Sequence, residues 1–263
     1  MAISAGTLLD SAALRSYLDS LVPSTTRAEL TGSVLPALVR AIGDVSALLR
    51  RAHTVAHVGT ANAFGDQQLN VDIAADDVIR AACKGCPSVV TASSEETPVE
   101  EALRPGEDSA APGSSERYTV AYDPLDGSSI IAPNWTVGAI VGVWDGDTAL
   151  GQSPHRSMVA AILGVFGPRT TAIVALRVPG IGEPACFELG IDAESLTMVQ
   201  PNIRFASPPF KTRYFAPANL RAAAECDKYS ALVSHFISQK YTLRYSGGLV
   251  PDVVHALVKG HGV

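Results

Sequence analysis

The sequence predicts an α/β protein built of stacked layers, because strand-like and helix-like segments alternate in two successive blocks. The blocks cover residues 1–200 and 201–263, and we predict that they form two domains. Hydrophobic residues make up 47% of the 263 residues, which is enough to fill a large core. Two strand-like runs of the first block end in acidic residues, so we expect this block to carry a site.

Three helices are predicted before residue 90, from apolar residues at helical spacing. Residues 7–20 form a short amphipathic helix. A second helix is predicted over 33–51, with Ser33 as the N-cap and Pro36 in the first turn. Asp66 is predicted to cap or begin a third helix, and Asp72 then lies on that helix.

Strands are predicted at 88–92 and 117–122, where β-branched and aromatic residues are enriched. The segment 98–116 between them is rich in Pro, Gly, Ser, Ala and Glu, which is typical of a mobile surface loop and makes it a candidate lid over the site. A further strand is predicted at 136–144, followed by a turn at 145–147.

The later elements are predicted from the same periodicities. In chain order they are a helix at 156–166, a strand at 170–178, a strand pair at 185–200, a helix at 219–237, a strand at 241–245 and a helix at 249–258.

The charge balance limits the class of partner. Acidic residues outnumber basic ones by 26 to 20, a net charge of −6, which argues against nucleic acid and against an anionic membrane. An anionic substrate is compatible with this balance if bound cations reverse the field at the site. The sequence has no run of about 18 apolar residues and no signal peptide at its start, so we expect a cytoplasmic protein without a membrane partner.

Two short patterns resemble metal sites and are better explained otherwise. Cys83 and Cys86 have CxxC spacing, but no second pair follows, which favours a thiol pair at a helix end over zinc. His53 and His57 lie four residues apart without a third ligand nearby, which favours polar residues of a loop.

The stretch Tyr122-Asp-Pro-Leu-Asp-Gly-Ser-Ser129 follows a predicted strand and carries two carboxylates, Asp123 and Asp126, three residues apart. Gly127 permits close approach of a ligand, while Ser128 and Ser129 offer hydroxyls and amides. Such a set suits Mg²⁺ with a phosphate beside it, because Mg²⁺ shares oxygen ligands between carboxylates and phosphates. An Asp-rich turn is the alternative, since Asp-Pro and Asp-Gly are common turn dipeptides.

A second acidic pair favours the metal site. Glu95 and Glu96 follow the strand predicted at 88–92, so two strands end in paired carboxylates. A solvated surface rarely explains both pairs.

Several motifs together resemble the lithium-sensitive, magnesium-dependent sugar phosphatases of the fructose-1,6-bisphosphatase superfamily. They are Asp123-Pro-Leu-Asp-Gly-Ser-Ser129, Ser94-Glu-Glu96, and Gly65-Asp66 with Asp72 six residues later. Phe64-Gly-Asp-Gln-Gln-Leu69, Gly167-Pro-Arg-Thr-Thr171 and Lys240-Tyr-Thr-Leu-Arg-Tyr-Ser-Gly-Gly-Leu-Val-Pro-Asp252 resemble sedoheptulose-1,7-bisphosphatases more closely. The resemblance runs from about residue 33 to the last residue, and it implies a layered α-β-α-β-α sandwich of the sugar-phosphatase type.

The chemistry and the resemblance together imply a role for each site residue. The expected ligands of two or three Mg²⁺ ions, with Mn²⁺ as an alternative, are Glu95, Glu96, Asp123, Asp126 and the carbonyl of Leu125. The resemblance implies that Asp66 and Asp72 position or deprotonate the attacking water beside Glu96. Asp126, Gly127, Ser128 and Ser129 would hold the cleaved phosphate, and Asn219, Arg244, Tyr245 and Leu249 the sugar and its distal phosphate. Relatives of this type lead us to expect a homo-oligomer, a dimer or tetramer.

The end of the chain departs from the family pattern. The sequence stops at Val263, within what relatives continue as a strand, so we expect a fragment rather than a natural short form, with the second β layer incomplete.

The expected function is Mg²⁺-dependent hydrolysis of the 1-phosphate of sedoheptulose 1,7-bisphosphate, with fructose-1,6-bisphosphatase activity as the alternative. A catalytically silent homologue, acting as a subunit or a metabolite-binding module, is the alternative of another class. If the metal site is real, Glu96→Gln or Asp126→Asn should abolish turnover and leave the fold intact, because each removes charge from a crowded acidic cluster.

Overall fold

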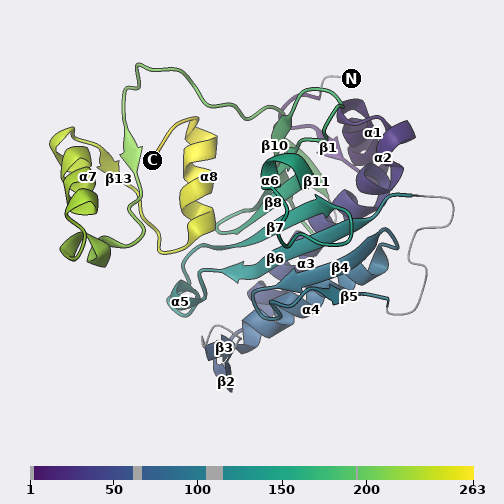
Figure 1. The fold of residues 1–263 in the computed structure, drawn as a ribbon, viewed down its shortest axis with the longest axis horizontal. Helices are drawn as coiled ribbons and strands as arrows, with labels where there is room; N and C mark the ends of the chain where they lie inside the picture. Colours follow the sequence, from purple (N-terminus) through teal and green to yellow (C-terminus); the bar gives the residue numbers. More distant parts are fainter. Residues whose placement is uncertain (1–2, 62–66, 105–114, 194) are drawn as a thin grey trace.

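The computed structural model describes residues 3–61, 67–104, 115–193 and 195–263. Within this part of the chain, the centre is a nine-stranded sheet with the order β1-β11-β10-β9-β8-β7-β6-β4-β5 (Figure 1). The strands are β1 (Leu8–Leu9), β4 (Val89–Ser94), β5 (Glu101–Ala102), β6 (Tyr118–Asp126), β7 (Val137–Asp145), β8 (Met158–Phe166), β9 (Thr170–Leu176), β10 (Ala185–Ile191) and β11 (Leu196–Gln200). Neighbouring strands of the described sheet are antiparallel except β4 and β6, which run parallel.

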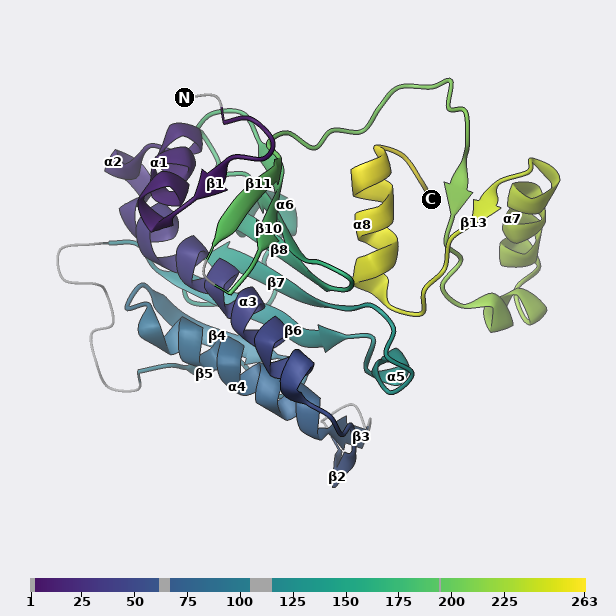
Figure 2. The same cartoon turned by 180° about the vertical axis from the view of Figure 1, so that it is seen from behind.

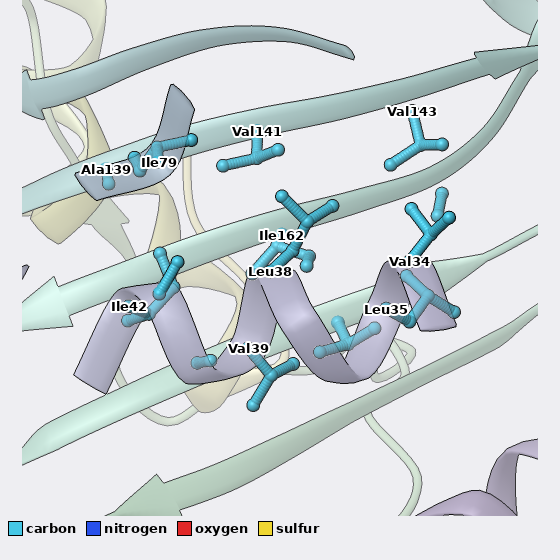
Figure 3. Packing of buried hydrophobic residues seen from close by; sticks show 14 of the residues in the cluster. Val34, Leu35, Leu38, Val39, Ile42, Ile79, Ala139, Val141, Val143 and Ile162 are labelled. Carbon is cyan, nitrogen blue, oxygen red and sulfur yellow. The ribbon is translucent and has the colours of Figure 1, made fainter. Parts of the chain in front are cut away.

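Helices cover one face of this sheet, with α3 and α4 lying along it (Figure 2). They are α1 (Ser11–Leu21), α2 (Ser24–Glu29), the π-helical turn η1 (Leu30–Val34), α3 (Leu35–Arg51) and α4 (Asn70–Gly85). Leu38 and Ile42 of α3 pack with Ala139, Val141 and Ile162 of the sheet, and all five are buried (Figure 3). The apolar stripe of α3 therefore fills the core between helix and sheet.

Glycines in the sheet show that a different helix covers the other face. A Cβ at Gly164 would lie 2.8 Å from Ile42 of α3. Gly164 pairs with Ala139, so the next residue along β7, Gly138, points to the opposite side. A Cβ at Gly138 would overlap Val250 of α8 (Leu249–Lys259), which places α8 on that side.

A second, smaller sheet lies beyond α8. It consists of the parallel strands β12 (Tyr214–Phe215) and β13 (Thr242–Leu243), with α7 (Asp227–Ser238) on its far side (Figure 1). The described layers are therefore α3/α4, large sheet, α8, small sheet and α7, which confirms the predicted α-β-α-β-α sandwich. The remaining elements are β2 (His57–Ala61), β3 (Gln67–Leu69), α5 (Ser128–Ile131), α6 (Pro154–Ser157) and the 3-10 helix η2 (Leu220–Ala224).

The helix predicted at 156–166 is wrong, because the chain forms α6 and then β8 there. β8 lies between β7 and β9 and is apolar on both faces. A strand that is apolar on both faces lacks the polar alternation that distinguishes it from a helix, so its periodicity alone misleads.

Several predicted boundaries also differ. The helix predicted at 7–20 begins at Ser11, after β1, and the helix predicted at 219–237 is divided into η2 and α7. Helical turns begin at Ser24, are interrupted at Arg27, and continue through η1 into α3, so Ser33 lies inside a helical turn and does not cap it. The third helix begins at Asn70; Asp66, its predicted start, lies outside the described residues. Strand β6 continues beyond Tyr122 to Asp126, with an irregular register between Asp123 and Asp126.

The helical stretch Thr25–Arg51 is long and apolar enough to cross a membrane by length and composition. Its apolar side chains nevertheless face the sheet, and Leu35, Leu38, Ile42 and Val45 are buried in the core. This burial accounts for the hydropathy of the stretch as that of a core helix.

Gly164 provides a test of the packing between α3 and the sheet. We expect Gly164→Ala to lower the free energy of unfolding by about 1–3 kcal/mol, because the new methyl would overlap Ile42 in a close-packed core. Urea unfolding of the variant measures this loss. Gly85→Ala is the control, since a Cβ at that helical glycine meets nothing within 4 Å, and equal stability of the two variants would contradict the packing.

Candidate active site

The parallel pairing of β4 and β6 brings the two predicted acidic strand ends together. Ser94 is the register partner of Tyr122, and the backbone N–H of Glu95 donates to the carbonyl of Tyr122 over 3.1 Å. Glu95 and Glu96 therefore leave β4 at the same edge of the sheet at which Asp123 lies on β6. The two acidic segments, predicted separately from the sequence, therefore lie at one edge of the sheet.

Helix α4 supplies a further carboxylate to this edge. Asp72 lies at the third position of α4, and its Oδ2 accepts a hydrogen bond from the backbone N–H of Leu69 over 3.0 Å. Only 4% of Asp72 is exposed, and its Oδ1 is buried without a hydrogen-bond partner among the described residues. The side chain thus caps α4 with one oxygen and leaves the other without a partner among the described residues.

Burial and repulsion by neighbouring carboxylates raise the pKa of two of these groups, Asp72 and Asp123. Burial, and then the charges of Glu96 and Glu95, raise the pKa of Asp72 to about 6. Burial, and then the charges of Glu95 and Asp126, raise the pKa of Asp123. A cation bound among these groups would relieve the repulsion, so the cluster favours positive charge.

The donors present fit Mg²⁺ in type and charge, because they are hard carboxylate oxygens and one of them, Asp72 Oδ1, is buried without a partner. The backbone N–H of Leu125 donates to Asp123 Oδ1 over 3.0 Å, which fixes the turn of the chain after Asp123. Within the residues that the structure describes, no three His, Cys, Asp or Glu side chains converge closely enough to hold a metal ion. A metal site at this edge would therefore require the carboxylate side chains to rotate towards one another.

Asp126 makes contacts that the sequence did not suggest. Its Oδ1 accepts from the backbone N–H of Leu249 over 3.0 Å, and its Oδ2 accepts from that of Val250 over 2.6 Å. These are the first two residues of α8, so Asp126 of the large sheet occupies the N-terminus of the middle helix layer.

A cavity of about 460 Å³ opens beside Asp126, between α8 and the small sheet. Four of the predicted substrate-binding residues line it, namely Asp126 itself, Arg244, Tyr245 and Leu249. The guanidinium of Arg244 lies 5.6 Å from the ring centre of Tyr214, which also lines the cavity. The fold thus brings residues of the second block to the acidic edge through Asp126.

The other predicted substrate residues are less closely grouped. Gly127 has a φ of 96°, a left-handed conformation that favours glycine, and it leads directly into α5. Ser128 and Ser129 begin α5 and are exposed. Asn219 precedes η2, is exposed and is not part of the cavity lining.

Several residues near the edge were not predicted from the sequence. The side-chain amide of Gln68 donates to Glu96 Oε2. Asp76, Arg80 and Tyr122 form a buried polar cluster next to Asp72 and Asp123. The sequence could have indicated part of this cluster, because the four-residue spacing of Asp72, Asp76 and Arg80 places all three on one side of a helix.

The five layers and the acidic sheet edge define the class of layered α/β folds to which the sequence motifs pointed. Residues 19–195 match the family described as fructose-1-6-bisphosphatase, N-terminal domain, and residues 209–263 match its C-terminal domain. The chain belongs to the fructose-1,6-bisphosphatase family.

Individual relatives agree with this assignment. The chain is 36% identical over 248 residues to a chloroplastic sedoheptulose-1,7-bisphosphatase of Triticum aestivum, covering 93% of this chain and 59% of that protein. It is 34% identical over 209 residues to a class 1 fructose-1,6-bisphosphatase of Syntrophotalea carbinolica, covering 78% and 58%. A crystal structure of a putative sedoheptulose-1,7-bisphosphatase from Toxoplasma gondii matches with a TM-score of 0.79 and 30% identity, covering 99% of this chain and 77% of that one. The chain thus spans about three fifths of the length of these curated relatives.

The contacts of Asp126 change what its substitution should do. We expect Asp126→Asn to destabilise the docking of α8 by about 1–2 kcal/mol, because an amide offers one acceptor where two backbone N–H groups need one each. Hydrogen exchange at Leu249 and Val250 should become faster. Asp44→Asn on the exposed side of α3 is the control, and unchanged exchange in the Asp126 variant would show that the cap is dispensable.

The raised pKa of Asp72 leads us to expect that the stability of the protein depends on pH. Its pKa is raised in the folded protein, so the folded state holds the proton more tightly, and stability should fall as pH rises from about 4 to about 6 and stay lower above that. In EDTA, Asp72→Asn should therefore be more stable than the wild type at pH 7.5, by about 1–3 kcal/mol, and about equally stable at pH 4.

Urea unfolding at the two pH values measures this difference. Asp77→Asn, an exposed neighbour on the same helix, should show no such pH-dependent gain. A gain for Asp72→Asn that is the same at both pH values would mean that repulsion at the acidic edge is not its cause.

Proposed function

We propose that this chain carries the reaction centre of a Mg²⁺-dependent sugar bisphosphatase. The favoured reaction is hydrolysis of the 1-phosphate of sedoheptulose 1,7-bisphosphate to sedoheptulose 7-phosphate, in sugar interconversion of the pentose phosphate or Calvin type. The observation that supports it most is the shared sheet edge, where parallel strands β4 and β6 place Glu95 and Glu96 beside Asp123, with Asp72 of α4 next to them.

We assign separate roles in phosphate-ester hydrolysis to the residues of this edge. Bound Mg²⁺ would neutralise the charge of the phosphoryl group and lower the pKa of water. Glu95, Glu96, Asp123, Asp126 and the Leu125 carbonyl are the proposed ligands, for two or three ions, with Mn²⁺ as an alternative. Asp72 suits the part of a base that positions and deprotonates the attacking water, because burial brings its pKa close to neutrality. Asp66 is proposed for the same task and lies outside the described residues.

The substrate is held on two sides of the acidic edge. The amides and hydroxyls of Gly127, Ser128 and Ser129 are proposed to orient the phosphate that is cleaved. The cavity beside Asp126 offers Arg244 and Tyr245 for the sugar and the distal phosphate, since a guanidinium binds phosphate through two donors. Asn219 and Leu249 complete the proposed sugar site.

Two alternatives have their own support. Fructose 1,6-bisphosphate is an alternative substrate, because relatives described as fructose-1,6-bisphosphatases match at 31–34% identity. A catalytically silent subunit or metabolite-binding module is the alternative of another class. It is favoured by the absence, among the described residues, of three side chains that already converge on a metal position.

The assembly and location are also proposals. Members of this family lead us to propose a homo-oligomer, a dimer or tetramer, that works on a small phosphorylated sugar and requires neither nucleic acid nor membrane. A cytoplasmic location is proposed from the sequence, although three matching relatives are described as chloroplastic.

Phosphate release in Mg²⁺ is the direct test. We expect kcat/KM to be higher on sedoheptulose 1,7-bisphosphate than on fructose 1,6-bisphosphate, and millimolar Li⁺ to inhibit. Glu96→Gln should lower kcat by about 10²–10³-fold without unfolding the protein, because one charged group at the transferring phosphate is lost. Glu183→Gln, an exposed acid on another part of the chain, is the control.

Two negative outcomes of this test would favour different alternatives. Equal or better turnover of the fructose substrate would replace the favoured substrate by its alternative. Binding of both bisphosphates without phosphate release would favour the silent module.

A further inference from the structure

The buried side of α4 continues past Asp72 with two more charged residues. Asp76, one helical turn further on, is only 7% exposed. Its Oδ2 accepts from Arg80 Nε over 3.3 Å, and Arg80 Nη1 donates to Glu101 Oε2 of β5 over 3.0 Å. A charge pair of this kind is costly to bury, so its position next to the acidic edge requires an explanation.

Tyr122 of β6 completes the cluster from the sheet. The residue is 6% exposed, and burial, followed by the charge of the neighbouring Asp76 carboxylate, raises the pKa of Tyr122. Three atoms of the cluster are buried without a hydrogen-bond partner among the described residues, namely Asp76 Oδ1, Arg80 Nη2 and the Tyr122 hydroxyl. They are an acceptor, a donor and a group that can be both, so they can satisfy one another after small rotations.

The cluster connects the elements whose ends form the candidate site. Helix α4 carries Asp72, and β6 carries Asp123 directly after Tyr122. Glu101 pairs with Ala92 of β4, the strand that leads to the acidic pair.

One cavity also borders both the cluster and the site. It measures about 540 Å³, and Asp76, Arg80 and Glu101 line it together with Glu96. The cavity is polar and large enough to hold water that bridges unpaired groups to one another.

We propose that Asp76, Arg80 and Tyr122 are positioning residues, which fix α4 and β6 against each other so that Asp72 and Asp123 face a common point. Arg80 adds a positive charge behind the acidic edge, which offsets part of the repulsion among carboxylates when they converge. A group of this kind behind the ligands commonly changes metal affinity without touching the metal. The part of the inference that concerns Mg²⁺ rests on the proposed function, whereas the positioning of the two carboxylates does not.

Hydrogen exchange of the metal-free protein tests the positioning directly. The N–H of Leu69 donates to Asp72 and the N–H of Leu125 donates to Asp123, so these two amides report the two carboxylates. We expect Tyr122→Phe and Asp76→Asn to speed exchange at both amides by about five- to tenfold, with the melting temperature nearly unchanged.

Each variant has a matched control. Tyr118→Phe removes a buried phenol from the same strand, but one that donates to Glu116 away from the acidic edge. Asp77→Asn changes the exposed neighbour of Asp76. Neither control should alter exchange at Leu69 or Leu125. A purely structural role would instead lower the melting temperature and speed exchange throughout α4 and β6, and that result would overturn the inference.

Calorimetric titration with Mg²⁺ gives the second measurement. We expect Asp76→Asn and Arg80→Met to weaken Mg²⁺ binding by about 10–100-fold, and Asp77→Asn to leave it unchanged. Wild-type affinity in the Asp76 and Arg80 variants, together with unchanged exchange, would refute positioning. If the wild type itself binds no Mg²⁺, the proposed function fails, while exchange at Leu69 and Leu125 still decides the role of the cluster.

Discussion

Strands β4 and β6 run parallel within an otherwise antiparallel described sheet, and the approach of Glu95 to Asp123 depends on that pairing. In an antiparallel pair, the carboxyl ends of the two strands would lie at opposite edges of the sheet, so Glu95, which follows β4, would lie far from Asp123 in the second half of β6. The parallel register of Ser94 with Tyr122 places them side by side. Parallel neighbours need a long connection, which accounts for the segment 95–117 between the two strands.

The acidic edge is costly for the fold, and two helices reduce this cost. Helix α4 directs its first N–H groups towards the edge and is capped there by Asp72. Helix α8 does the same from the opposite face of the sheet, where Leu249 and Val250 donate to Asp126. Since the N-terminus of a helix carries a partial positive charge, the two helices offset part of the repulsion before any ion binds. The helices that form layers on the two faces of the sheet therefore also reduce the electrostatic repulsion at its acidic edge.

Sequence patterns predicted the layered fold class and the two acidic pairs, because the alternation of elements and the spacing of carboxylates are local features. They did not predict that the two pairs share one edge, which depends on the parallel pairing of β4 with β6. Asp72 was placed on a helix, and the paired carboxylates were placed at strand ends, from spacing and family motifs alone. The patterns failed where tertiary contacts decide the outcome. Strand β8 resembles a helix in sequence because both of its faces are apolar, although only one of them is fully buried. Ser33 resembles an N-cap because nothing local reveals that a π-helical turn joins α2 to α3.

Local sequence patterns also do not reveal polar contacts between elements that are far apart in the chain. Asp126 contacts residues more than 120 positions further along the chain, and no spacing rule links such positions. The cluster of Asp76, Arg80 and Tyr122 likewise requires α4 to lie on β6 before its members meet. A sequence shows which groups can ionise, whereas the fold determines which of them share an enclosed space.

The double contact of Asp126 makes the backbone of α8 a competitor for the carboxylate. Any cation that draws Asp126 towards itself must do so against two amide protons, so its apparent affinity is reduced by the free energy that the helix loses. By the same linkage, whatever loosens α8 makes this oxygen pair more available to the cation. Helix α8, which borders the cavity beside Asp126, and any ion bound at the sheet edge would thus compete for one carboxylate, and thermodynamic reciprocity would require each to respond to the other.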